Sequence, residues 1–388
     1  MSEYQYYEWQ TVDRQLTESE QEAVSGLSSH IEVSSSRAVV SYSYGDFKHD
    51  ARQVLARFFD AHIYLANWGS RRLLFRFPSG LVNPDAIEPC CMDDRITFKR
   101  VNGYDVLDMD LSEEEGGDWV ESEGSLSRLV SLRGDIIHGD YRCVYLAWLK
   151  AMSLEGEAPS YVRKHRVATP PPPTVPAGLR QLSPSLKRFV EQFDVSRSLV
   201  EAAAEDSPER AEAAVTDFRP LVAQLSREKC DEFLCRVAQD DATAVMALKK
   251  QLWSLVPRVS TELEMRRPFG ELQKRADTIE ATRLQREKEK ARRKHETKMK
   301  ALADHEAETW QEVAALVEQK QTKGYEAAVK LLVRLKQLAE FRGSWDNYRG
   351  QANDLCARYK RLSGFTSRVQ KAGVLEDQKD RSLDQHGL

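Results

Sequence analysis

The most constraining feature of this sequence is a highly charged segment over residues 265–310 that contains very few apolar residues. Within it, residues 286–296 run Arg-Glu-Lys-Glu-Lys-Ala-Arg-Arg-Lys-His-Glu, a composition typical of a helix. A helix that is polar on all sides cannot be buried in a core. It has to cross solvent, pair with a partner or contact a phosphate backbone. The segment therefore predicts a long exposed helix and the most accessible candidate binding surface of the chain.

The basic residues of this segment support three interpretations. Cations near one helical face favour nucleic-acid binding through counterion release, or binding of a protein partner. Interleaved glutamates at positions 280, 287, 289 and 296 instead offer i,i+3 and i,i+4 pairs that stabilise a solitary helix, and no interleaved aromatic residues are present for base stacking. We favour the solvated structural helix and keep the two binding hypotheses open. The candidate contact residues are Arg283, Arg286, Lys290, Arg293, Lys294 and Lys298.

Charge is unevenly distributed along the chain. The 388 residues carry 57 Lys and Arg against 61 Asp and Glu, which gives a net charge of −4. Residues 1–168 have 18 basic against 27 acidic side chains, whereas residues 265–300 have 13 against 6. This asymmetry predicts that the basic segment meets either the acidic end of the chain or an acidic partner.

The sequence carries no mark of a secreted or membrane protein. Residues 1–10 lack the basic start and apolar run of a signal peptide, and no apolar stretch approaches the length that spans a bilayer. The six cysteines form neither a Cys-x-x-Cys pair nor a disulfide-like framework. We therefore expect a cytoplasmic protein with reduced thiols and no membrane partner.

The N-terminal part has a mixed pattern that predicts an α+β domain. Strands are expected over residues 37–44, 62–68 and 71–77 because β-branched and aromatic residues gather there. Residues 50–60 carry apolar side chains at helical spacing. Asn102-Gly103 lies between two β-like runs, 95–101 and 104–109, and both residue types tolerate positive φ. This dipeptide predicts a two-residue hairpin.

Aromatic residues at the N-terminus alternate as in a strand, at positions Tyr4, Tyr6, Tyr7 and Trp9. We expect this strand to form a sheet edge that packs on the domain. The alternative is a strand that recognises a partner.

A proline run marks the predicted domain boundary, since residues 168–176 contain five prolines, which exclude helix and favour a stiff extended linker. After it every pattern is helical. Ser183 and Pro184 are expected at the start of one helix, and breaks at 323–324 and 342–343 separate helices near the C-terminus. The predicted organisation is an α+β head 1–167, a Pro-rich linker 168–178, a helical domain 179–257, a long charged helix 258–309, a C-terminal helical module 310–375 with helical hairpins, and a flexible tail 376–388.

No group of side chains predicts a catalytic, cofactor or metal site. His49-Asp50 and His138-Gly139-Asp140 lack a second histidine at i+3 or i+4 and are expected at helix ends. Carboxylates near the hairpin are interpreted as acids on a solvated strand face rather than cation ligands. They are Asp93, Asp94, Asp105, Asp108 and Asp110. Cys230 and Cys235 lie five residues apart and are expected to be buried structural thiols.

The C-terminal region resembles a known helical segment. The residues that carry the resemblance are Trp310-Gln-Glu-Val313, Leu316-Val317, Tyr325-Glu-Ala-Ala-Val329, Leu331-Leu332, Leu335, Leu338-Ala339 and Ala372-Gly373. They are similar to the C-terminal helical part of bacterial SWIM zinc-finger proteins. The resemblance implies a shared helical module. It does not carry over zinc binding, because the Cys-x-Cys and Cys-x-His pattern of those proteins is absent here.

These patterns together predict a non-enzymatic scaffold or adaptor that binds other proteins, in the manner of proteins from bacterial regulatory or defence (CRISPR-type) operons. The alternative is an accessory nucleic-acid-binding protein that uses the basic helix 283–300. We expect only weak nucleic-acid binding, because the glutamates offset about half of the positive charge. A hydrolase in the acidic head is the third hypothesis.

Overall fold

In a computed structural model of the protein, the structure describes residues 4–92, 95–113, 124–157, 171–210, 218–239, 241, 244–255 and 265–376. The chain divides into two compact units, Met1–Glu280 and Ala281–Leu388. The first unit combines an antiparallel sheet with helices, and the second is all helical. The predicted fold class, an α+β part followed by an all-α part, is confirmed.

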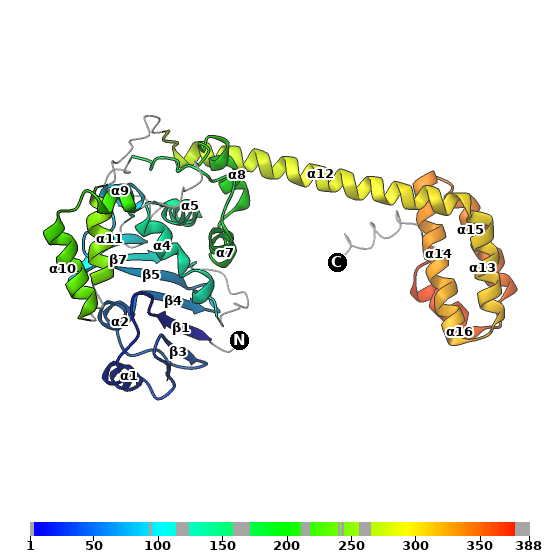
Figure 1. Ribbon diagram of the computed structural model, residues 1–388. Coiled ribbons are helices and arrows are strands. Elements are labelled where there is room, and N and C mark those ends of the chain that lie inside the picture. Colours follow the sequence, from blue (N-terminus) through cyan, green and yellow to red (C-terminus); the bar gives the residue numbers. More distant parts are fainter. Residues whose placement is uncertain are drawn as a thin grey trace. The chain divides into compact units, whose positions relative to one another are not determined.

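A seven-stranded antiparallel sheet forms the centre of the first unit (Figure 1). Its strands are β1 Gln5–Gln10, β2 Glu32–Val33, β3 Arg37–Tyr42, β4 Ala61–Ala66, β5 Arg71–Pro78, β6 Ile96–Val101 and β7 Tyr104–Asp110, in the order β2-β3-β1-β4-β5-β7-β6. β1 pairs with β3 on one side and β4 on the other. The expectation that this N-terminal strand lies at a sheet edge is therefore wrong, because both of its hydrogen-bonding sides are occupied.

The predicted hairpin is confirmed as β6 and β7. Asn102 and Gly103 both have positive φ, at 50° and 83°, as a two-residue turn of type I′ requires. The register places Val101 opposite Tyr104 and Ile96 opposite Met109. Because β7 already pairs with β5, this hairpin leaves β6 as the last strand of the sheet.

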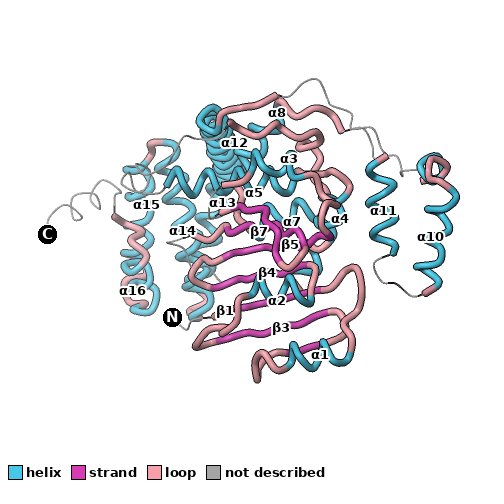
Figure 2. Tube along the Cα trace, turned by 90° about the vertical axis from the view of Figure 1, so that its left-hand side faces the viewer, coloured by secondary structure: helices cyan, strands magenta, loops and turns pink. Residues whose placement is uncertain are grey.

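Helices cover both faces of the sheet (Figure 2). On one face, α1 and α2 pack on a core around Trp9, Leu55 and Leu74. On the other, a larger core combines strand residues such as Phe75 with residues of α4, α5, α7 and α8. The helices of these two layers are α1 Glu18–Ser25, α2 Ala51–Phe58, α4 Ser131–Ile137, α5 Arg142–Glu157, α7 Pro184–Gln192 and α8 Arg197–Glu205.

Six further elements are described in the first unit. They are α3 Pro84–Ile87, η1 Glu88–Cys90, η2 Leu126–Arg128, α9 Arg219–Val222, α10 Arg227–Ala238 and α11 Ala244–Ser254. The predicted start of α7 is confirmed, because the Ser183 side chain accepts a hydrogen bond from the Leu186 amide and Pro184 occupies the first turn.

The compact division of the chain differs from the predicted boundary at residues 168–178. Residues 158–170 lie outside the described part. The part that is described is tied to its surroundings, since the Val175 amide bonds to the Met265 carbonyl at 2.8 Å and Val175 is buried. Phe189 of α7 and the C-cap residue Phe193 lie in the same core as the sheet. There is a physical reason why the proline run does not separate two domains. Prolines exclude helix and strand pairing within the run itself, but the apolar side of α7 after the run can still pack on the sheet.

The second unit packs four helices around one core. They are α13 Glu306–Glu318, α14 Thr322–Arg342, α15 Trp345–Arg358 and α16 Ser363–Lys371. Apolar residues at helical spacing form this core, and Val313, Leu332 and Tyr348 are among those buried. The predicted break at 342–343 is the left-handed C-cap Gly343, with φ 69°. The break predicted at 323–324 lies instead inside the first turn of α14.

The long charged helix is α12, Phe269–Asp304, and it is shorter at both ends than the predicted 258–309. Leu272 and Ala276 belong to the core of the first unit, while Met299 and Leu302 are buried in the second. No side chain of α12 between Ala276 and Met299 is buried. None of the helices in the described ranges combines the length and apolar character that a bilayer crossing requires.

Candidate interaction surfaces

The six predicted contact residues all lie on α12 in the second unit, and each of their side chains is exposed. With about 100° of rotation per residue, they fall on one arc of about 140° around the helix axis. We call this set the basic arc; its members are Arg283, Arg286, Lys290, Arg293, Lys294 and Lys298. Residues 281–388 as a whole carry 23 Lys and Arg against 16 Asp and Glu, so the arc belongs to a basic unit.

The other side of α12 packs within the second unit. Met299 and Leu302 form a small buried cluster with Leu338 of α14. The ring of His295 lies 6.3 Å from that of Phe341, edge to face. This packing fixes the rotation of the last turns of α12, so the basic arc is turned away from α14.

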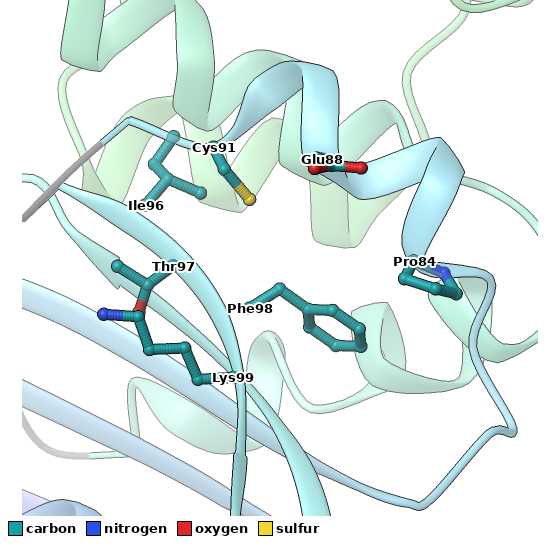
Figure 3. Close-up of a pocket in the computed structure, with 7 residues that line it drawn as sticks. All are labelled: Pro84, Glu88, Cys91, Ile96, Thr97, Phe98 and Lys99. Atoms are coloured by element: carbon teal, nitrogen blue, oxygen red, sulfur yellow. The ribbon is translucent and has the colours of Figure 1, made fainter.

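A groove lies along β6, the last strand of the sheet (Figure 3). We call it the edge groove; its volume is about 580 Å³ and its lining residues are Pro84, Glu88, Cys91, Ile96, Thr97, Phe98 and Lys99. In Figure 3 the residues of α3, η1 and Cys91 form one wall and the strand residues the other, with the Phe98 ring between them.

The walls of the edge groove combine apolar with polar side chains, and Glu88, Thr97 and Lys99 are the polar ones. The half-buried Phe98 ring lies 6.5 Å from the ring of Phe77, and Ile96 is fully buried. Burial raises the pKa of the Cys91 thiol, which the Phe98 amide beside it partly offsets, and the sulfur lies 3.7 Å from the Ile87 carbonyl oxygen. Cys91 is therefore a neutral, apolar wall at neutral pH rather than a nucleophile.

A buried polar cluster lies on the opposite face of the sheet, beside α2. A cavity of about 200 Å³ there is lined by Gln5, Tyr7, Asp46, Ala51, Arg52, His62, Tyr64, Arg72 and Leu74. The Gln5 amide joins the cluster, because its oxygen accepts from the hydroxyls of Tyr7 (2.8 Å) and Tyr64 (3.0 Å). Its nitrogen donates to the Gly45 carbonyl at 2.8 Å.

His62 is the titratable group at the centre of this cluster. Its Nδ1 lies 2.9 Å from the Glu8 carbonyl, which can only accept, so Nδ1 carries the proton. Its ring stacks on Trp9 with centroids 4.5 Å apart. Complete burial lowers the pKa of His62 to about 3, so the imidazole is neutral in the folded protein.

The hairpin carboxylates are placed differently from the prediction. Asp105 and Asp108 are buried, and Asp108 accepts two hydrogen bonds from Arg72 at 2.7 and 2.6 Å. Asp105 lies 3.0 Å from a guanidinium nitrogen of Arg100 and also accepts from the Gly80 amide. The prediction of a solvated face for these two acids is wrong, because paired arginines and an amide compensate their burial. Asp110 is half-buried, and Asp93 and Asp94 lie outside the described residues.

The histidine–aspartate pairs stand at helix ends, as predicted. The Asp50 side chain caps α2 by accepting from the Arg52 amide. His138 is the C-cap of α4, and its Nδ1 lies 2.6 Å from the Gly134 carbonyl. Asp140 is a buried acid that pairs with Arg142 at 2.7 Å.

The thiols of α10 are not buried as predicted. Cys235 is exposed and Cys230 is half-exposed, and α10 buries none of its side chains. Leu234 and Val237 of the same helix are also largely exposed. The prediction rested on the usual burial of free cysteine, which does not hold on a helix that buries none of its side chains.

The edge groove has no counterpart in the sequence predictions. The hairpin signal located β6, but the position of that strand at the sheet edge depends on strand order, which short-range patterns do not contain. Across the described part of the chain, no three His, Cys, Asp or Glu side chains converge as ligands for a metal ion. No protein-family model, curated protein or solved structure matches this chain.

Proposed function

We propose that this protein is a non-enzymatic scaffold or adaptor that binds an acidic protein partner through the basic arc of α12. The observation that carries the proposal is the arrangement of that helix. Six cationic side chains lie exposed on one arc, in a stretch where α12 buries nothing, and the opposite side packs on α14 near its end. An exposed like-charged surface of this kind attracts a partner of opposite charge.

The composition of the arc favours protein over nucleic acid. Glu287 falls inside the arc, about 20° from Lys294 and from Lys298 at 100° per residue. A carboxylate at that place repels phosphates but can pair with a cation on a protein surface. Residues 283–300 contain no Phe, Tyr or Trp on which bases would stack.

A charge-neutralised variant tests the proposal. In Arg286→Gln/Lys290→Gln/Arg293→Gln/Lys294→Gln the fold should persist, because these side chains are exposed. The matched control Lys323→Gln/Lys330→Gln/Arg349→Gln/Lys360→Gln removes four exposed charges from the same unit. Proteins from a lysate of the native host that bind the wild type and the control, but not the arc variant, would be the partners. Titration with the purified partner should show an affinity loss of about 30-fold, at about 0.5 kcal/mol per exposed ion pair.

Nucleic-acid binding is the second candidate function, favoured by the basic excess of residues 281–388. Fluorescence anisotropy with a labelled RNA strand and a DNA duplex distinguishes it. The adaptor proposal expects weak binding that disappears near physiological salt. Tight binding at that salt, removed by the arc variant with a change of about 3–4 in the slope of log K against log salt, would replace it with the nucleic-acid function.

A further inference from the structure

We propose that the outer side of β6 and the edge groove capture an extended segment of a partner protein as an added strand, and that this segment alternates apolar with acidic residues. The site belongs to the first unit and uses none of the residues of the basic arc, so it stands or fails independently of the proposed function. Addition of a strand to a sheet edge combines main-chain hydrogen bonds with pockets for alternate side chains.

The register shows which backbone groups face outward. A two-residue turn makes Val101 and Tyr104 a hydrogen-bonded pair, so alternate residues of β6 bond to β7 and the residues between them point away. Ile96 confirms this direction, since its N–H and C=O bond to Met92 at 3.0 and 2.9 Å on the outer side. By the same alternation, Phe98 and Arg100 direct their N–H and C=O groups outward.

Apart from the Phe98 amide, these outward groups are open to a partner. The Phe98 amide lies against the Cys91 sulfur, a weak acceptor. Within the described ranges, the backbone of Phe98 and Arg100 makes no outer backbone hydrogen bond. Met92 already occupies the position of a neighbouring strand beside Ile96. A peptide that continues that line would therefore extend a pairing that the chain itself begins.

Side chains on the two sides of β6 define the chemistry of the peptide. Phe98 and Ile96 point to the larger core face, where the groove wall adds Cys91 and Pro84. Every second residue of an added strand would lie against these apolar side chains. The residues between them would lie on the other face beside the exposed Lys99, where an acidic side chain gives a cross-strand ion pair.

A second copy of this chain fits the same edge poorly. Antiparallel pairing of two β6 strands through Phe98 and Arg100 puts the two-fold axis at Lys99. The two Lys99 side chains would then face each other in the close, non-hydrogen-bonded position. Like charges at that position are destabilising, and an edge lysine is a common device against self-pairing. We therefore assign the occupant as a peptide of a different protein.

Labelled synthetic peptides of about six residues test the proposal by fluorescence anisotropy with the full-length protein. One alternates valine with aspartate, the second alternates valine with lysine, and the third is the aspartate peptide with alternate amides N-methylated. We expect the aspartate peptide to bind at least about tenfold more tightly than the N-methylated one, which loses two or more main-chain hydrogen bonds. It should also bind more tightly than the lysine peptide.

Two variants sharpen the test. Lys99→Glu should reverse the preference toward the lysine peptide, whereas Lys48→Glu, an exposed lysine elsewhere in the first unit, should not. Arg100→Pro removes one outward N–H at an edge, where proline is tolerated, and should weaken binding several-fold. Equal binding of the N-methylated peptide would overturn strand addition, and an unchanged preference in Lys99→Glu would overturn the acidic assignment. Binding of none of the peptides would overturn both. A concentration-dependent dimer that Arg100→Pro abolishes would identify a second copy as the occupant instead.

Discussion

The neutral, buried imidazole of His62 predicts that acid weakens the first unit in a specific way. His62→Gln is the informative change, because an amide can still donate to the Glu8 carbonyl but does not titrate between pH 5 and 7. Protonation of the ring costs free energy, because the ring is fully buried and stacked on Trp9. The variant therefore removes the effect of proton binding on stability but keeps a side chain that can form the same hydrogen bond.

The magnitude follows from the two protonation states. Folding lowers the pKa of His62 to about 3, whereas an unfolded histidine has a pKa of about 6.5. Between these values the unfolded chain binds a proton that the folded chain does not. The contribution of His62 to the free energy of unfolding is therefore full above about pH 6.5. It falls as the pH drops and stops falling at the pKa of the folded state. From pH 7 to pH 5 the loss is about 2 kcal/mol, at about 1.4 kcal/mol per pH unit below 6.5.

Urea denaturation at pH 7 and pH 5 measures this loss, with hydrogen exchange of peptides that cover β1 and β4 to assign it to the first unit. The wild type should lose about 2 kcal/mol more than His62→Gln between the two pH values. His30→Gln, which removes an exposed imidazole, should keep the wild-type loss. Equal losses in the wild type and His62→Gln would refute the buried, neutral state.

Two further substitutions test packing and buried charge. A Cβ at Gly324 would lie 2.6 Å from the Leu316 carbonyl oxygen, so Gly324→Ala should destabilise the second unit by about 1–3 kcal/mol in thermal melts. Gly350→Ala, with open space around its Cβ, should instead be neutral or stabilise α15, and equal effects would contradict the close helix approach. Asp60→Ala leaves the buried Arg76 guanidinium, 2.7 Å from the carboxylate, without its acid, and should cost about 3–5 kcal/mol in urea denaturation. A cost near zero would show that water replaces the carboxylate.

Features set by neighbours in sequence were predicted well. The Asn102-Gly103 turn and the Ser183 cap each depend on two to four consecutive residues, so the sequence contains all that is needed to predict them. Strand order depends on contacts between distant segments. The aromatic alternation of β1 predicted a strand correctly, but nothing local distinguishes an edge strand from an interior one.

Buried charge was the main source of error at the candidate sites. Asp108 has the alternation of a solvated strand face, and its partner Arg72 lies 36 residues away in sequence. An acid and an arginine on adjacent strands are recognisable as a pair only when the register of β5 and β7 is known. The basic arc, in contrast, was predicted because a single helix sets the relative positions of all six residues.

The charged residues in the middle of α12 have to stabilise the helix, and in the proposed function they also bind a partner. Between Ala276 and Met299 no side chain of the helix is buried, so tertiary packing adds little there beyond the partly buried Ile279 and the contact of His295 with Phe341. Strong helix formers and pairs such as Arg292–Glu296, at 3.5 Å and worth about 0.3–0.5 kcal/mol, have to stabilise it instead. Helix formation requires many Lys, Arg and Glu residues, but it does not require the cations to gather on one side. Arg292 and Glu296 lie outside the basic arc at 100° per residue, so this ion pair consumes none of its charges. Helix stability alone does not require six cations on one side, and the proposed binding of an acidic partner would use that arrangement.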